Sequence, residues 1–151
     1  MKKSPALPLA LMALLLLGAG CKENPTEAAC ETVQGRVEGV SAPVFDGEAL
    51  TGFRVEKASV SGDMTGSSSA DFTITRFGED GTLFLAGAHT FWDGADAFLF
   101  RTTDEGLTTA DGQVQNEMQI VEGATGRLST VGTVDLQTGA LTLDYTGEVC
   151  R

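Results

Sequence analysis

Hydrophobic and polar residues alternate along most of the chain after residue 30. The alternation is clearest at 141–146, where every second residue of Leu-Thr-Leu-Asp-Tyr-Thr is apolar, and it recurs at 33–37 and 72–76. This period of two is that of a β-strand with one buried face. No window after residue 30 sustains the i, i+3, i+4, i+7 spacing of an amphipathic helix. The pattern therefore predicts an all-β domain.

Short turn signals separate these alternating segments. Pairs such as Asp46-Gly47, Asp80-Gly81, Asp93-Gly94 and Asp111-Gly112 accept the backbone conformations of tight hairpin turns. They divide the chain into eight predicted strands, at 31–40, 50–60, 70–78, 82–92, 95–103, 113–122, 127–136 and 140–150. Many short strands joined by hairpins are typical of a β-sandwich or a β-barrel.

Two cysteines, Cys30 and Cys150, stand at the two ends of the β-domain, about 120 residues apart. An eight-stranded antiparallel sheet can close on itself, which removes the exposed edges and makes the first and last strands neighbours. A disulfide between Cys30 and Cys150 would then join this seam, and it is worth up to ~4–5 kcal/mol in the chain-entropy model. A sandwich could also bring its ends together, but the pattern favours the closed barrel.

The first twenty residues have the three regions of a signal peptide. Lys2 and Lys3 form a positive start, 7–17 is apolar, and Gly18-Ala19-Gly20 supplies small residues for cleavage. The apolar run is shorter than the ~20 residues of a membrane-spanning helix. We therefore expect residues 1–20 to be removed.

The segment Leu17-Gly18-Ala19-Gly20-Cys21 resembles the lipobox of bacterial lipoproteins, whose cysteine is acylated and becomes the new N-terminus. Gly18 stands where Leu is usual, so simple secretion is the alternative. Residues 21–29 then form a lipidated cysteine and tether, followed by a barrel domain at 30–151. Acyl chains contribute ~0.8 kcal/mol per buried CH₂, enough for stable anchoring. Lys22 stands where an inner-membrane retention signal has Asp, which favours the outer membrane in a Gram-negative cell envelope.

The net charge of −11 limits the kinds of molecule that the protein can bind. Removal of the leader takes away two lysines and no acidic residue, which makes the charge more negative. Such a chain repels phosphate backbones, so the sequence argues against binding to nucleic acid.

Three segments near the end of the chain read Asn-Glu-Met-Gln-Ile-Val-Glu-Gly-Ala-Thr-Gly-Arg at 116–127, Gly-Thr-Val-Asp-Leu at 132–136 and Tyr-Thr-Gly-Glu-Val-Cys, which we call the closing motif, at 145–150. They resemble segments of the allene oxide cyclase barrel-like and dirigent-like proteins. The resemblance covers roughly 82–150, with the last forty residues carrying most of it, and departs at Glu122-Gly123-Ala124, where a Gly-Gly pair is usual. It implies an eight-stranded antiparallel barrel with an apolar interior. The plant members cyclise an unsaturated fatty-acid epoxide or steer a radical coupling, but the matching stretch is a structural turn and carries over no catalytic residue.

His89 is the only histidine in the chain, and it shares strand parity with Leu83, Leu85 and Phe91. It can therefore face the interior, where a hydrogen-bonded structural role is the first interpretation. One histidine and a paired set of cysteines leave few ligands for a transition metal, and no Gly-x-Ser-x-Gly motif is present. We expect no metal, no cofactor and no assignable catalytic residue.

Other strand residues have two interpretations. Phe91 and Trp92 are core residues by default and could instead line an apolar cavity. Arg76 shares parity with Phe72, so it could point inward and pair with Glu117 or Asp144, although a solvated place at the rim is commoner. We interpret Asp71, Arg101 and Asp104 in the same way, as charges within or beside strands that are commonly solvated, and 67–69 (Ser-Ser-Ser) as a flexible loop. The candidate cavity-lining residues are His89, Phe91, Trp92, Arg76 and Glu117.

Three functions remain open from the sequence. The first is a non-catalytic envelope lipoprotein whose barrel binds a small apolar ligand or a partner. The second is an enzyme of the isomerase or cyclase kind, by analogy with the plant proteins. The third is a structural envelope protein with a solid barrel.

Overall fold

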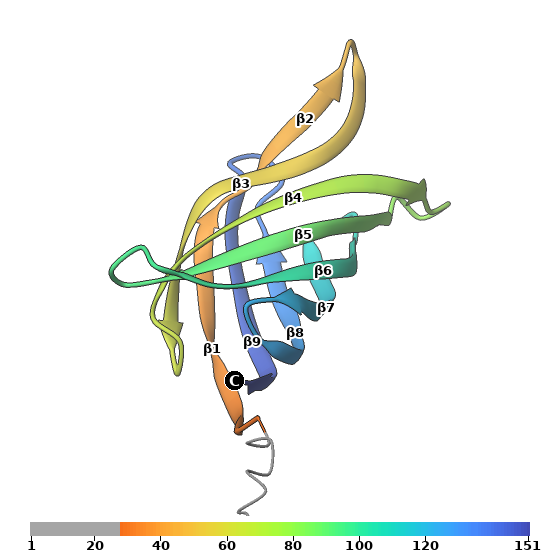
Figure 1. Ribbon diagram of the computed structural model, residues 1–151. Coiled ribbons are helices and arrows are strands. Elements are labelled where there is room, and N and C mark those ends of the chain that lie inside the picture. Colours follow the sequence, from red (N-terminus) through yellow and green to blue (C-terminus); the bar gives the residue numbers. More distant parts are fainter. Residues whose placement is uncertain (1–27) are drawn as a thin grey trace, which may run out of the picture.

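The computed structural model describes residues 28–151, all of which belong to one β-domain (Figure 1). Its nine strands are β1 (Cys30–Val40), β2 (Ala42–Asp46), β3 (Ala49–Gly62), β4 (Gly66–Phe77), β5 (Leu83–Asp93), β6 (Phe98–Thr108), β7 (Gln113–Glu122), β8 (Thr125–Val134) and β9 (Ala140–Cys150). The expected signal peptide, Cys21 and the tether as far as residue 27 lie outside the described residues.

The strands form one antiparallel sheet that closes into a barrel. Its order is β1-β9-β8-β7-β6-β5-β4-β3-β2, and β1 also pairs with β3. This second pairing joins 35–38 to 59–62 and completes the circle of eight strands. The prediction of an eight-stranded antiparallel barrel is confirmed.

Strand β2 is an additional strand that the sequence pattern did not predict. Among the described strands it pairs only with β3, and the two form a hairpin that projects from one end of the barrel (Figure 1). The Asp46-Gly47 turn was predicted, and Gly47 has the positive φ of 61° that such a turn uses. The strand before it was missed because β2 has only five residues, one of them Pro43.

Two other predicted boundaries were wrong. The fifth predicted strand, 95–103, is in fact β6 at Phe98–Thr108, because the Asp93 carboxylate accepts hydrogen bonds from the backbone of Ala95 and Ala97 and holds them in the turn. The segment 67–69, predicted as a loop, lies in β4 and pairs with strands on both sides. Strand pairing on both edges outweighs the weak preference of serine for strands.

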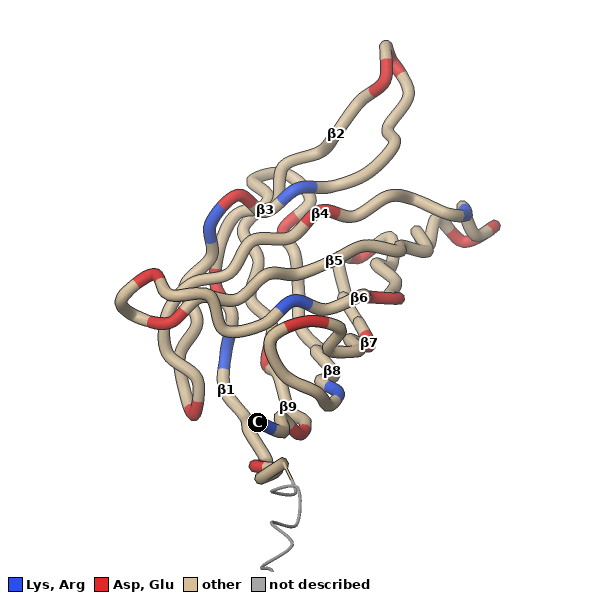
Figure 2. Tube along the Cα trace, in the orientation of Figure 1, with Lys and Arg blue, Asp and Glu red and all other residues tan. Residues whose placement is uncertain are grey.

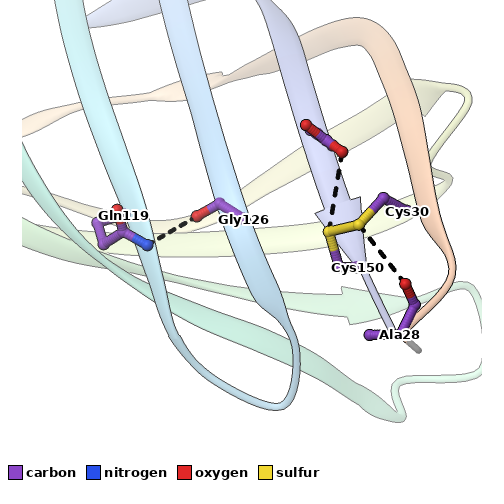
Figure 3. Close-up of a disulfide and its surroundings, with 6 residues drawn as sticks. Ala28, Cys30, Gln119, Gly126 and Cys150 are labelled. Atoms are coloured by element: carbon purple, nitrogen blue, oxygen red, sulfur yellow. Dashed lines mark hydrogen bonds between the residues drawn. A yellow bond between two sulfur atoms is a disulfide. The ribbon is translucent and has the colours of Figure 1, made fainter. Parts of the chain in front are cut away.

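The predicted disulfide is present at the seam of the barrel. Cys30 and Cys150 are register partners in the β1–β9 pair, and their sulfur atoms are bonded (Figure 3). This covalent bond joins the start of the first strand to the end of the last. We call this end of the barrel, with the β3–β4, β5–β6 and β7–β8 turns, the closed end.

Tyr145 on β9 stabilises the short β1–β3 contact from the interior of the barrel. Its hydroxyl accepts a hydrogen bond from the Met64 backbone at 2.9 Å and donates one to the Ser61 carbonyl at 3.1 Å. A Cβ at Gly35 would lie 2.4 Å from this hydroxyl, so only glycine leaves room for the ring to cross β1. This contact gives a structural role to the tyrosine of the closing motif.

The buried hydrophobic cluster extends from the closed end to Leu141 near the mouth, and its largest side chains lie in the half next to the closed end. Phe91 and Phe100 pack there with ring centroids 4.8 Å apart. Other buried members on the same half are Val33, Val60, Met64, Ala70, Met118, Ile120, Leu128, Tyr145 and Val149.

Acidic residues are distributed along the whole domain, many of them at turns (Figure 2). Within residues 28–151, we find no helix with the length and apolar character needed to cross a membrane.

Candidate functional site

A cavity of about 570 Å³ opens at the end of the barrel opposite the disulfide. We call this end the mouth; it includes the β1–β2 junction and the β8–β9 turn. The inward walls are apolar and come from several strands, among them Leu83, Leu85, Val114, Leu141 and Leu143. Three exposed side chains at the rim, Val40, Phe45 and Leu136, also line it.

Three buried polar residues line this mostly apolar cavity: His89, Asn116 and, nearer the mouth, Thr108. The His89 ring lies between Phe72, which meets it edge-on at 5.3 Å, and Phe91, which stacks at 5.6 Å. Because Phe91 packs in the half of the barrel next to the closed end, His89 and Asn116 form the boundary between the cavity and that half. We call this boundary the floor.

Behind the floor, the Asp104 carboxylate connects the polar side chains. Its Oδ2 lies 2.5 Å from His89 Nδ1 and accepts a hydrogen bond from Asn116 Nδ2 at 3.0 Å. Its Oδ1 accepts a hydrogen bond from the Thr102 hydroxyl at 2.5 Å. Both carboxylate oxygens are therefore satisfied by side chains of three strands, as a buried charge requires.

The environment of Asp104 favours its ionised form. Burial raises the pKa of this carboxyl, but the contact with His89 and the hydrogen bonds from Thr102 and Asn116 outweigh burial, and the pKa lies below its ordinary value. The carboxylate thus accepts a hydrogen bond from the N–H of His89 Nδ1, and this bond fixes the orientation of the ring. In the neutral imidazole, a proton on Nδ1 leaves Nε2 as an acceptor.

One floor atom has no hydrogen-bond partner. Asn116 Oδ1 is buried and unbonded within the described part of the chain, although the amide nitrogen of the same side chain is bonded to Asp104. Gly106 lies across the strand pair from Asn116, and a Cβ there would come within 2.8 Å of Oδ1. A buried acceptor without a donor costs ~1–3 kcal/mol, so this oxygen favours a donor from elsewhere.

The alternation of β6 places Asp104 at the floor. Phe100, Thr102 and Asp104 are buried, whereas the residues between them are exposed. Asn116 has the same inward parity in β7 as Met118. Each polar residue therefore occupies a position that the strand pattern gives to the interior.

The structure separates the five residues that the sequence suggested as cavity lining. His89 lines the cavity, and Phe91 lies below it in the core. Trp92 is half-buried and does not line it. Arg76 and Glu117 are exposed and do not form an ion pair with each other. The Arg76 guanidinium instead lies 3.5 Å from the centre of the Phe84 ring.

A β-bulge explains why parity failed for Arg76. The pairing of β4 with β5 shifts between Ile74 and Arg76, which interrupts the simple alternation from Phe72. Conversely, Asp104 was expected among solvated charges, and this expectation was wrong. The signal that could have found it is its parity with Phe100 and Thr102 in one strand.

The described residues contain one group with the donor types of a metal site, formed by Cys30, Glu148 and Cys150. Its two sulfur atoms are bonded to each other in the disulfide, so they are not thiolate ligands.

Comparison of the chain with protein-family models, with curated proteins and with solved structures finds no match.

Proposed function

We propose that the barrel binds a small apolar ligand in the cavity at its mouth, as the soluble domain of a cell-envelope lipoprotein. The observation that carries the proposal is a cavity of about 570 Å³ with apolar walls and a polar floor. Small-molecule sites typically have volumes of ~300–1,000 Å³, mostly apolar walls and a few placed polar groups. Eight-stranded barrels are wide enough to hold one small ligand.

The exposed rim supports the same proposal. Val40, Phe45 and Leu136 are more than half exposed, and all three border the opening. A ligand that extends to the rim would cover part of this surface, with a gain of ~25 cal/mol per Å² removed from water.

Binding can be measured with N-phenyl-1-naphthylamine, an uncharged dye that fluoresces in apolar surroundings. The informative variant is Val114→Trp, which puts a large ring at an inward position of the cavity. The matched control is Val121→Trp on the same strand, where the native side chain is 54% exposed and lies outside the cavity. The dye is excited directly, so that the added tryptophan does not contribute to the signal.

We expect the native protein and Val121→Trp to bind the dye with similar affinity and Val114→Trp to bind at least tenfold more weakly. Equal binding by all three proteins would place the dye outside the cavity and contradict the proposal. Absence of binding by the native protein would contradict it as well.

We propose further that acylated Cys21 anchors the domain, as expected from the lipobox-like segment, with the outer membrane favoured in a Gram-negative cell. Strand β1 starts at Cys30 at the closed end and reaches the mouth at Val40. A tether that enters at Cys30 therefore joins the barrel at the end opposite the opening.

Cys21→Ser should move the protein from membrane to soluble fractions. A variant that still sediments with membranes would contradict anchoring through this thiol.

We also propose that the chain is a member of the allene oxide cyclase barrel-like and dirigent-like proteins. The closed eight-stranded barrel supports this, as does the place of the closing motif, whose Tyr145 hydrogen-bonds to β3 beside its contact with β1 and whose Cys150 forms the disulfide. The motif residues are structural, so membership carries no activity.

Acid–base isomerisation is a second candidate function, favoured by the pairing of His89 with Asp104. A carboxylate on Nδ1 orients an imidazole and supports proton transfer at Nε2. The test is exchange of the protons next to the carbonyl of 2-decanone in D₂O, followed by NMR. Exchange faster with the native protein than with His89→Gln would support the candidate, and exchange at the buffer rate would remove it.

A further inference from the structure

We infer that the ligand has a hydroxyl at its inner end and donates a hydrogen bond from it to the floor, as a long-chain alcohol would. This inference rests on the proposed function, because it names the chemical class of ligand for the same cavity.

The polar atoms available at the floor are acceptors. Asp104 accepts a hydrogen bond from the N–H of His89 Nδ1, and in the neutral ring this leaves Nε2 with a lone pair. No hydrogen bond joins Nε2 to another described residue, and His89 lines the cavity. Asn116 Oδ1 is the second acceptor without a partner. A ligand must therefore bring a donor to satisfy this surface.

The donors at the floor are directed largely at Asp104. The Thr102 hydroxyl and one N–H of the Asn116 amide both bond to this carboxylate. A ligand with only acceptor atoms, such as an ether, would place its oxygen beside His89 Nε2 and Asn116 Oδ1 and could donate a hydrogen bond to neither of them. The floor thus distinguishes a hydroxyl from an ether of nearly the same shape.

Charge argues against a carboxylate. Asp104 lies directly behind His89 and Asn116, and described cationic side chains are absent from the residues that line the cavity. An anionic head would lose its hydration in an apolar cavity and face a buried negative charge there. The net charge of −11 opposes an anionic ligand at longer range as well.

The first experiment compares three ligands that share a ten-carbon chain: 1-decanol, 1-methoxydecane and decanoate. Each is titrated against N-phenyl-1-naphthylamine bound to the native protein at pH 7.5. We expect 1-decanol to displace the dye at a concentration at least tenfold below that of the other two.

The single histidine allows a direct second readout by ¹⁵N NMR. In the free protein, the spectrum should show a protonated Nδ1 and an unprotonated Nε2. Addition of 1-decanol should move the Nε2 resonance in the direction of a new hydrogen bond, whereas 1-methoxydecane should leave it unchanged. A ring protonated on Nε2 at this pH would overturn the inference, because the floor would then present a donor.

The matched variants are Asn116→Leu and Thr130→Val. Thr130 is buried, is the register partner of Asn116 and also has an unbonded oxygen, but it does not line the cavity. Asn116→Leu should reduce the preference for 1-decanol over 1-methoxydecane at least threefold, and Thr130→Val should preserve it.

The outcomes separate this inference from the proposed function. If 1-methoxydecane or decanoate displaces the dye as well as 1-decanol, the hydroxyl inference is wrong and cavity binding stands. If the dye itself does not bind, or binds equally to Val114→Trp, the proposed function is wrong and the inference falls with it.

Discussion

The two halves of the barrel are built from the same strands but have opposite interiors. Toward the closed end, inward positions carry large side chains such as Phe91, Phe100 and Leu128, which are almost completely buried. Toward the mouth, the inward residues surround a cavity of about 570 Å³. The floor of His89 and Asn116, with Asp104 behind it, divides the halves. Under the proposed function, the closed half supplies most of the packing and the mouth half holds the ligand.

The disulfide should give the largest effect, and it belongs to the closed half alone. Replacing both Cys30 and Cys150 with alanine releases a loop with a sequence separation of 120 residues. The chain-entropy model predicts a loss of about 4–5 kcal/mol in the free energy of unfolding, measured by urea denaturation. Dye binding under native conditions should persist in this variant, because the mouth is at the other end. Loss of dye binding while the variant is still folded would show that the halves are coupled.

Truncation of one aromatic residue in each half tests the contrast in packing. Phe100 is buried without residual exposure, and its replacement by alanine should cost about 3–5 kcal/mol in urea denaturation. Phe45 at the rim is 57% exposed, and its replacement by alanine should change stability by about 0.5 kcal/mol or less. Equal losses would mean that the mouth is as tightly packed as the core.

The floor predicts a pH-dependent effect of intermediate size. The pKa of Asp104 is below its ordinary value in the folded protein. Its carboxylate therefore stabilises the fold above the ordinary Asp pKa of ~3.9, and this contribution is lost as pH falls through the lower folded pKa. Asp104→Asn should cost about 1–3 kcal/mol at pH 7, and the difference from the native protein should narrow below about pH 4.

Glu105→Gln is the control for this measurement. Glu105 is the next residue in β6 and is exposed. Its replacement should leave the stability nearly unchanged at pH 7. A difference between Asp104→Asn and the native protein that stays constant from pH 7 into acid would exclude an ionised Asp104.

The smallest predicted loss of stability within the closed half is at the β1–β3 contact. Tyr145→Phe removes the hydroxyl that bonds to the Met64 backbone and the Ser61 carbonyl. We expect a loss of about 1 kcal/mol in the free energy of unfolding, with faster hydrogen exchange at 59–62 on β3. Exchange that accelerates first at the mouth would instead contradict a stabilising role for the closed half.

The fold was predictable because its signals are local. Alternation within each strand and Asp-Gly pairs between strands are both visible over a few residues, and the sixth predicted strand, 113–122, coincides with β7. Closure was also predictable, since Cys30 and Cys150 mark the two strands that must meet. Strand β2 was missed because five residues beside a proline give too short a pattern.

The site was predictable only in part because it depends on register. Parity placed His89 in the interior, but its partner Asp104 was assigned to solvent, as an isolated strand carboxylate usually is. Only the pairing of β5, β6 and β7 brings His89, Asp104 and Asn116 together. The prediction of an inward Arg76 was wrong for a related reason, because a bulge changes parity within a strand and leaves no clear signal in the sequence.

The most direct test is a crystal structure of the protein with a ten-carbon alcohol that carries bromine at the far end. The anomalous signal of bromine should lie at the rim near Val40, Phe45 and Leu136, with the hydroxyl within hydrogen-bond distance of His89 Nε2. A mouth half filled by its own side chains, or a ligand bound only on the outer surface, would contradict the account.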